Sequence, residues 1–409
     1  MPIPGNIHIK DYDYPLPSSR IAQFPLEKRD ESKLLICKSG NISESVFAKI
    51  GNELPDDSIL VFNDTKVIRA RIIFSKPTGA TIEIFCLEPI LPVTEIEASF
   101  VQTETCVWKC LVGNVKRWKE GFLKKSFVHK GISYQLIAEK QENIGDGCFS
   151  IRFTWQPSEI PFSEIIEFAG LIPLPPYITR ASTSLDNDRY QTIYAKHEGS
   201  VAAPTAGLHF TETVLDILKK KKIEFRNVQL HVGIGTFRPV SVDDIAYHIM
   251  HSEHVSIDLS TLKDLTKQQK PVFAIGTTSV RTLESLYWLG VKLIVDGDAH
   301  APEVQQWDAY DSRYDINIST SEALMALAVF LKNKKLDRYN GETSLMIVPG
   351  YRFRIVDGMI TNFHMPQSTL LLLVAALIGP AWKSTYEYAL QHDFRFLSYG
   401  DACLFFKSV

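Results

Sequence analysis

Short apolar runs alternate with polar turns along the chain, and outside residues 67–155 they also alternate with segments of helical periodicity. Residues 58–62 and 271–275 are continuous apolar runs, which are typical of buried strands. Residues 211–222 begin with Thr211, a good N-cap, and place their apolar positions on one face. They end in four lysines, which suit the negative end of a helix. Strands and helices that alternate in this way predict an α/β sheet.

Residues 67–155 show a different pattern. Short β-prone runs are separated by glycines and charged residues, and none has a helical period. Such a series predicts a small antiparallel barrel or sandwich. Because this segment interrupts the α/β pattern, we interpret it as an insertion. The predicted fold is therefore mixed α/β, with a larger α/β sheet domain formed by residues 1–66 and 156–409 and an inserted antiparallel β-barrel domain formed by residues 67–155.

Composition narrows the classes of function. The 409-residue chain has a formal net charge of −3, so any RNA binding must rest on local patches rather than on the overall field. One such patch is the lysine- and arginine-rich segment 116–125, with Trp118 and Phe122; it either contacts RNA or forms a solvated hairpin. The six scattered cysteines are typical of free thiols in a reducing cytosol.

The N-terminal segment lacks the basic start and apolar run of a signal peptide. The longest apolar run, residues 370–378, is shorter than the roughly 20 residues that a membrane-spanning helix needs. We therefore expect a cytoplasmic protein without a membrane partner, and in the absence of coiled-coil heptads we expect a monomer.

One stretch, residues 188–211, is dense in groups that can contact a polar ligand. Its first part is polar, and its second part has small residues that let a ligand approach the backbone. A binding-site wall and a long surface loop explain this composition equally well. The candidate residues are Arg189, Tyr190, Gln191, Ala203, Pro204, Thr205, Gly207 and His209.

Polar residues also follow two predicted strands directly. Asn63 and Asp64 follow residues 58–62 and either contact a ligand or form a plain Asx turn. After residues 271–275, a glycine and a hydroxyl cluster open a helix, which is the layout of an anion-binding helix N-terminus; N-capping is the alternative. The residues of this second turn are Gly276, Thr277, Thr278, Ser279 and Arg281.

Histidines stand in three further motifs. His231 precedes Gly233 and Gly235, but Arg238 occupies the place of the third glycine of a dinucleotide fingerprint. The histidines at 248, 251 and 254 have a spacing that does not place all three on one face, so we expect no metal site. Asn362 and His364 lie just before the apolar helix predicted at 368–378, whose burial turns this polar loop away from the core.

Eight segments, in order, resemble the signature sequences of S-adenosylmethionine:tRNA ribosyltransferase-isomerases, the enzymes of queuosine biosynthesis. The resemblance runs from Asp11 to Phe405. Two departures are extra residues around 296–314 and near Asn340, and Gln367 where the family usually has lysine. The segments are FNDTKVIRARI, PLPPYITR, DRYQTIYAKHEGSVAAPTAGLHFT, LHVGIGTFRPV, MHSEH, AIGTTSVRTLES, PGYRFRIVDGMITNFHMPQSTLLLLV and FLSYGDACLF.

The resemblance implies a larger α/β domain interrupted by a small β-barrel. It also implies an enzyme that transfers and isomerises the ribosyl moiety of S-adenosylmethionine onto 7-aminomethyl-7-deazaguanine at the wobble position of tRNA. The products are epoxyqueuosine-tRNA, adenine and methionine. S-adenosylmethionine is then a substrate rather than a permanently bound cofactor, no metal is needed, and tRNA is the partner. A non-catalytic RNA-binding protein and a histidine-based metal hydrolase are the alternatives.

The chemistry of this reaction suggests roles for the candidate residues. The sulfonium acidifies the protons on the adjacent ribose carbon, and a base that removes one gives an ylide and expels adenine, after which the tRNA amine attacks the ribose. Histidine suits the first step, and we predict His209 or His231 as the base. The turn 276–281 is the candidate for the methionine carboxylate. Other predicted contacts to the RNA base, its phosphates or the donor are Asn63, Asp64, Arg189, Tyr190, Gln191, Ala203, Pro204, Thr205, Gly207, Gly233, Gly235, Tyr351, Arg352, Asn362 and His364.

Overall fold

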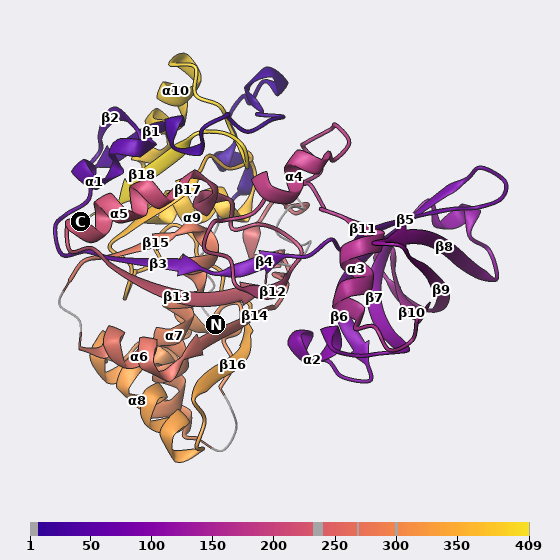
Figure 1. Ribbon diagram of the computed structural model, residues 1–409. Coiled ribbons are helices and arrows are strands. Elements are labelled where there is room, and N and C mark those ends of the chain that lie inside the picture. Colours follow the sequence, from indigo (N-terminus) through magenta and orange to yellow (C-terminus); the bar gives the residue numbers. More distant parts are fainter. Residues whose placement is uncertain (1–6, 232–239, 268–269, 299–301, 409) are drawn as a thin grey trace.

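A computed structural model describes residues 7–231, 240–267, 270–298 and 302–408. Within these ranges, nine strands form one mixed sheet in the order β16–β14–β13–β3–β15–β17–β18–β1–β2 (Figure 1). The strands are β1 (Lys33–Lys38), β2 (Asn41–Val46), β3 (Ile59–Asn63), β13 (Glu224–His231), β14 (Glu253–Asp258), β15 (Val272–Ile275), β16 (Arg338–Thr343), β17 (Gly358–Asn362) and β18 (Ala402–Phe406).

The centre of this sheet is parallel and covered on both faces. β13, β3, β15 and β17 pair in parallel, and antiparallel pairs lie toward both edges. All five residues of β3 are buried, and they alternate between two cores: Val61 packs toward α6, α7 and α8, while Leu60 and Phe62 pack toward α1 and α5. These helices are α1 (Ile50–Glu53), α5 (Glu212–Lys220), α6 (Leu259–Thr266), α7 (Gly276–Asp296) and α8 (Thr320–Asn333).

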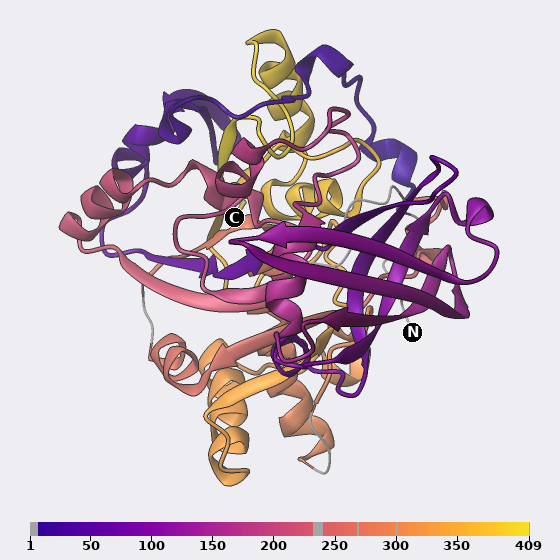
Figure 2. The same cartoon turned by 45° about the vertical axis from the view of Figure 1, so that its right-hand side comes forward.

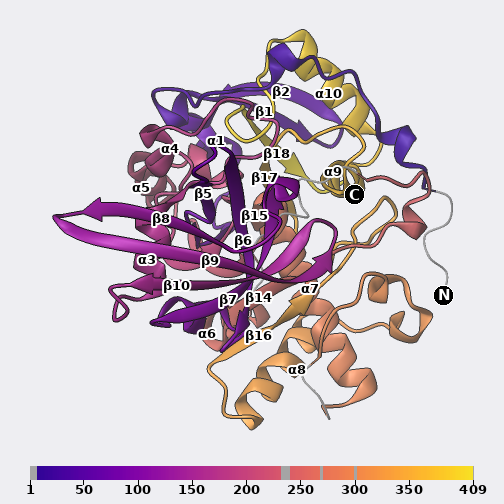
Figure 3. The same cartoon turned by 90° about the vertical axis from the view of Figure 1, so that its right-hand side faces the viewer.

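The second sheet has seven strands and projects to one side of the first in Figure 1, coming forward in Figures 2 and 3. Its order is β11–β5–β6–β7–β10–β9–β8, and neighbouring strands in this order pair antiparallel. The strands and the two helices that pack on them are β5 (Arg71–Ser75), β6 (Thr81–Leu91), β7 (Thr105–Gly113), β8 (Phe122–His129), β9 (Ile132–Gly145), β10 (Cys148–Gln156), β11 (Gly170–Leu171), α2 (Ile96–Phe100) and α3 (Phe162–Ala169).

This second sheet is a curled antiparallel half-barrel, so the predicted antiparallel β-barrel is confirmed only in part. Lys125 of β8 reaches the backbone oxygen of Ile73 in β5 with its Nζ at 3.2 Å, but no ladder joins these two strands among the residues described. Aromatic side chains of α3 and the sheet fill the concave side, so the apolar interior is covered without closure. β11 and α3 lie beyond residue 155, and the division into two domains remains a prediction.

The two sheets are linked where the chain leaves β3. β4 (Thr65–Val67) pairs in parallel with β12 (His197–Ser200). The side-chain amide of Gln191 accepts from Val67 N at 2.9 Å and donates to Val67 O at 3.1 Å, as a neighbouring strand would. The remaining helix in this region is α4 (Ser184–Arg189), whose N-terminus is closed by a capping box of Thr183 and Asp186.

The predicted helix at 211–222 is α5, and Thr211 caps it by accepting from Val214 N at 3.3 Å. The apolar helix at 368–378 is α9 (Thr369–Ile378), capped by Ser368, and α10 (Ala381–Gln391) follows it. In the part of the chain described, no single helix is long and apolar enough to cross a membrane; only α9 and α10 together meet that test, and they are bent by 112°. Short 3-10 helices are η1 (Ile9–Tyr12), η2 (Ser18–Arg20), η3 (Arg29–Glu31), η4 (Phe47–Lys49), η5 (Val115–Arg117), η6 (Thr205–His209), η8 (Ile245–Tyr247), η9 (Asp308–Tyr310) and η10 (Ser312–Tyr314).

Candidate functional site

A cavity of about 380 Å³ lies at the carboxyl ends of β15 and β17, and we call it the central cavity. In parallel sheets, ligands bind at this edge because the loops that leave neighbouring strands converge there. Most of its wall is apolar, with a few hydroxyl, amide and imidazole groups, as in small-molecule sites. It is lined by Pro176, Tyr177, residues 202–206, residues 276–278, residues 361–366, Ser368, Leu370, Leu397 and Ser398.

Four side chains form a hydrogen-bonded chain that ends at this cavity. Ser32 Oγ lies 2.9 Å from His209 Nδ1, and His209 Nε2 lies 3.0 Å from Asn362 Nδ2. Thr205 Oγ1 donates to Asn362 Oδ1 at 2.8 Å. Thr205 and Asn362 line the cavity, whereas His209 lies behind them with both ring nitrogens engaged. Burial lowers the pKa of His209 to about 4, so the ring is neutral at pH 7.

The N-terminus of α7 opens into the central cavity. Gly276 has φ +85°, a conformation that favours glycine, and the helix has no side-chain cap. Thr278 Oγ1 is buried without a hydrogen-bond partner among the residues described. The first N–H groups of a helix have no partner within the helix, and the positive end of its dipole suits an anion, so the role of this turn stays a prediction.

Two residues of this motif do not face the cavity. Ser279 Oγ donates to the backbone oxygen of Ile275 at 2.8 Å, within the first turn of the helix. Arg281 is buried and pairs with Glu253 of β14. The helical rotation from residue 276 to residue 281 thus turns the arginine toward the neighbouring strand, where its charge is paired with the Glu253 carboxylate rather than with a ligand.

His364 is the imidazole that lines the central cavity itself. Its Nε2 lies 2.9 Å from Thr361 Oγ1, and its backbone oxygen accepts from the Tyr14 hydroxyl. Burial lowers the pKa of His364 to about 3, so the ring is unprotonated at neutral pH. Next to it, Gln367 does not line the cavity and donates to Asp13 Oδ2 at 3.0 Å.

His231, the second predicted base, lies in a different place. It lines a cavity of about 670 Å³ between the two sheets, together with His251, Glu253 and His254. Burial lowers the pKa of His231 to about 4, and the charge of His254 acts in the same direction. Gly233 and Gly235 lie outside the described residues. Among the residues described, no group of three or more histidine, cysteine, aspartate or glutamate side chains could hold a metal ion.

Asn63 and Asp64, predicted together, have different environments. Asn63 is buried and donates to Leu230 O at 2.9 Å, and its Oδ1 accepts from two backbone N–H groups, so its amide joins β3 to β13. Asp64 lines a separate polar cavity of about 260 Å³, where its Oδ1 has no partner on another described residue. Burial raises the pKa of Asp64.

The polar first part of the stretch 188–211 is bound to the protein itself. Arg189 donates to the backbone oxygens of Glu27 and Leu26, and Gln191 holds Val67 as described above. Tyr190 is fully buried in an apolar cluster. The second part lines the central cavity through Ala203, Pro204 and Thr205.

Gly207, the remaining small residue predicted in this stretch, packs against Tyr194 instead. A Cβ on Gly207 would lie 1.9 Å from the Tyr194 hydroxyl oxygen. No side chain larger than hydrogen fits at this position without a shift, so the glycine is required by close packing rather than by a ligand.

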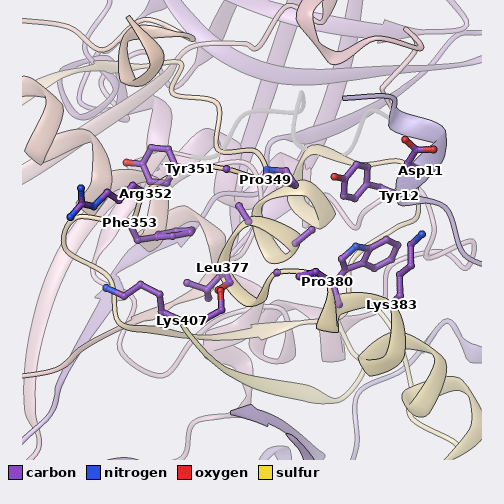
Figure 4. A pocket seen from close by; sticks show the side chains of 16 residues that line it. Asp11, Tyr12, Pro349, Tyr351, Arg352, Phe353, Leu377, Pro380, Lys383 and Lys407 are labelled. Atoms are coloured by element: carbon purple, nitrogen blue, oxygen red, sulfur yellow. The ribbon is translucent and has the colours of Figure 1, made fainter. Parts of the chain in front are cut away.

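Tyr351 and Arg352 lie at a groove of about 930 Å³ around the C-terminal end of α9 (Figure 4). The Tyr351 hydroxyl donates to Glu284 Oε2 at 2.8 Å and accepts from Trp288 Nε1 at 2.8 Å, so it belongs to the core. Arg352 is exposed at the edge of the groove.

The sequence analysis did not select four residues of this site. Ser32 meets His209 across 177 positions in sequence, a contact that only the fold creates. Pro176 and Tyr177 were interpreted only as part of a rigid, extended path, and Ser398 lies in a loop without a distinctive pattern. Pro176, Tyr177 and Ser398 lie in two of the family-like segments, whereas Ser32 lies in none of them.

Comparison with known proteins agrees with the predicted family. A family model described as queuosine biosynthesis protein matches residues 9–405. A Trichlorobacter lovleyi protein named S-adenosylmethionine:tRNA ribosyltransferase-isomerase is 36% identical over 402 residues, which cover 97% of this chain and 99% of the relative. One of the same name from Thermotoga petrophila is 37% identical over 402 residues, with the same coverage.

A solved structure of the S-adenosylmethionine tRNA ribosyltransferase from Thermotoga maritima is 29% identical and covers 97% of this chain and 99% of its own, with a TM-score of 0.46. The family assignment rests on the sequence matches, which run along almost the entire chain. The chain therefore belongs to the family of queuosine biosynthesis proteins, the S-adenosylmethionine:tRNA ribosyltransferase-isomerases.

Proposed function

We propose that this protein transfers and isomerises the ribosyl moiety of S-adenosylmethionine onto 7-aminomethyl-7-deazaguanine at the wobble position of tRNA, releasing adenine and methionine and leaving epoxyqueuosine-tRNA. Family membership supports the reaction. The central cavity supports its location, since five of the eight family-like segments contribute to its wall. S-adenosylmethionine is the ribosyl donor, and the relatives do not favour an RNA-binding protein without catalysis or a metal hydrolase.

The N-terminus of α7 is the proposed site for the methionine carboxylate. Three features support it: backbone N–H groups without a side-chain cap, the positive φ of Gly276, and the unpaired hydroxyl of Thr278. A carboxylate accepts several hydrogen bonds at once and gains from the helix dipole. The apolar part of the wall, from Ala202 to Ala206, suits the adenine ring.

The proposed general base is His364. A base must reach the ribose carbon beside the sulfonium and must be unprotonated before it acts. His364 lines the central cavity, whereas His209 and His231 do not. The imidazole takes one proton from the carbon attached to sulfur, the ylide then expels adenine, and the amine of the tRNA base attacks the ribose. The bond between the ribose carbon and sulfur breaks, which releases methionine.

Release of adenine tests this proposal. The protein, S-adenosylmethionine and tRNA with the aminomethyl base are combined, and free adenine is measured by chromatography. We expect adenine only when tRNA is present. Without adenine release, or with release that is independent of tRNA, the proposed function is wrong.

Alanine variants of His364 and His231 then test the base. His364→Ala is expected to bind S-adenosylmethionine and to release adenine at least 100-fold more slowly, since general base catalysis contributes about 10²–10⁴-fold. His231→Ala serves as the comparison, because its ring lines the neighbouring cavity. Adenine release at the wild-type rate by His364→Ala would exclude this histidine as the base.

A further inference from the structure

The direction of each hydrogen bond in the chain from Ser32 to Thr205 can be assigned. The backbone oxygen of Asp401 lies 3.5 Å from Asn362 Nδ2 and can only accept, so the amide nitrogen is the atom that faces Asp401 and His209. An amide nitrogen only donates, and His209 Nε2 must therefore accept. The neutral ring carries its proton on Nδ1 and donates to Ser32 Oγ.

This assignment fixes the hydroxyl of Thr205 as well. With its nitrogen turned toward His209, Asn362 presents Oδ1 to Thr205, and an amide oxygen only accepts. The hydroxyl hydrogen of Thr205 is thus donated to Asn362 Oδ1 within the cavity wall. What remains for a ligand in the central cavity is the oxygen of Thr205, which can accept a hydrogen bond and cannot donate one.

We propose that Thr205 is a specificity-determining residue that accepts a hydrogen bond from an N–H group of bound S-adenosylmethionine, and that Asn362 and His209 are positioning residues that hold its hydroxyl in this orientation. The inference rests on the proposed function for the identity of the ligand. Two N–H groups of S-adenosylmethionine have the required chemistry: the 6-amino group of adenine and the α-ammonium of methionine. A ligand with a carbonyl oxygen at the same place leaves two acceptors facing each other.

Two analogues of S-adenosylmethionine separate these sources. In one, a 6-oxo group replaces the 6-amino group of the purine; in the other, hydrogen replaces the α-amino group. We expect the wild-type protein to bind one of them about 10- to 100-fold more weakly than S-adenosylmethionine, as for a buried acceptor left without its donor. The analogue with the weaker binding identifies the N–H group.

The Thr205 variants test the residue. Thr205→Val removes the acceptor oxygen and keeps the shape of the side chain. In this variant, the ratio of the dissociation constants of the weaker analogue and S-adenosylmethionine is expected to fall below threefold, while Thr205→Ser retains the wild-type ratio. Thr192→Val is the matched control, because Thr192 is a buried threonine of the same stretch that does not line the central cavity. Calorimetry on the full chain without tRNA gives the dissociation constants.

The His209 variants test the positioning role. His209→Gln keeps an acceptor near the place of Nε2 and is expected to retain the discrimination, while His209→Leu lacks the acceptor and is expected to lose it. Replacement of a residue with a merely structural role does not change the ratio of the dissociation constants of the two ligands.

Three outcomes overturn the inference: equal binding of both analogues and S-adenosylmethionine to the wild type, unchanged discrimination in Thr205→Val, or no binding of S-adenosylmethionine. Because these measurements need no tRNA, they separate failure of this inference from failure of the reaction. A protein that discriminates as expected but releases no adenine supports the role of Thr205 and refutes the proposed function.

Discussion

Replacement of His209 by glutamine is expected to make the protein less sensitive to acid. The ring is 4% exposed, and its burial lowers its pKa to about 4, whereas the pKa of histidine in the unfolded chain is about 6.5. The unfolded chain therefore binds a proton more tightly than the native protein. This contribution to the free energy of unfolding is complete above pH 6.5 and is lost as the pH falls toward 4.

From these two pKa values, protonation of this ring in the unfolded chain lowers the free energy of unfolding by about 2 kcal/mol at pH 5 relative to pH 7. His209→Gln cannot take up this proton, so its loss of stability between pH 7 and pH 5 should be smaller than that of the wild type by about 2 kcal/mol. Buried His231 and His364 also respond to acid, but they are present in both proteins and cancel in the difference.

Urea unfolding at pH 7 and pH 5, followed by tryptophan fluorescence, measures this difference. The compared quantity is the change in the free energy of unfolding between pH 7 and pH 5, so it does not matter whether His209→Gln is less stable than the wild type at pH 7. His392→Gln, which replaces an exposed histidine after α10, shows whether removal of any histidine has the same effect. Equal losses of stability in wild type and His209→Gln, within about 0.5 kcal/mol, would refute the neutral, buried state of this ring.

Three further substitutions test contacts that the structure assigns to the protein itself. Asn63→Ala removes three hydrogen bonds to backbone groups and should lower the free energy of unfolding by about 3 kcal/mol in urea unfolding. Arg281→Met leaves the charge of Glu253 buried and should cost about 3–5 kcal/mol by the same assay, most of which a second change, Glu253→Met, restores. Gly207→Ala should cost about 1–3 kcal/mol, and less in combination with Tyr194→Phe, because the added Cβ meets the Tyr194 hydroxyl oxygen. If one of these single variants has the wild-type free energy of unfolding, the contact that it removes does not stabilise the protein as assigned.

The alternation of strand-like and helix-like segments predicts the large sheet, because the burial of successive residues in a strand depends on local geometry. Residues 58–62 form β3, and the alternation of Leu60, Val61 and Phe62 between two cores follows from strand geometry alone. Closure of the second sheet is different. It depends on whether β8, at one edge of the sheet, pairs with β5 or β11 at the other end, and a pattern of strands and turns does not contain that pairing.

The site is predicted less completely than the fold, for a related reason. A polar residue after a strand indicates that a partner is needed, but it does not say whether the partner is a ligand or the backbone of a neighbouring strand. Asn63 joins β13, and Arg281 pairs with Glu253, because strands distant in sequence lie beside them. Thr277 and Thr278, by contrast, stand at the start of α7 and line the central cavity.

The same reasoning explains the polar density of residues 188–211. Most of this stretch lies outside helices and paired strands, so its backbone lacks ladder hydrogen bonds and must be held by side chains. Arg189 and Gln191 supply those contacts, to residues 26–27 and to Val67. Only after β12 does the chain turn into the central cavity, where small residues bring its backbone to the wall and Thr205 presents its oxygen. Polar residues that suggest a ligand site thus fix the path of the chain, and the small residues that follow line the central cavity.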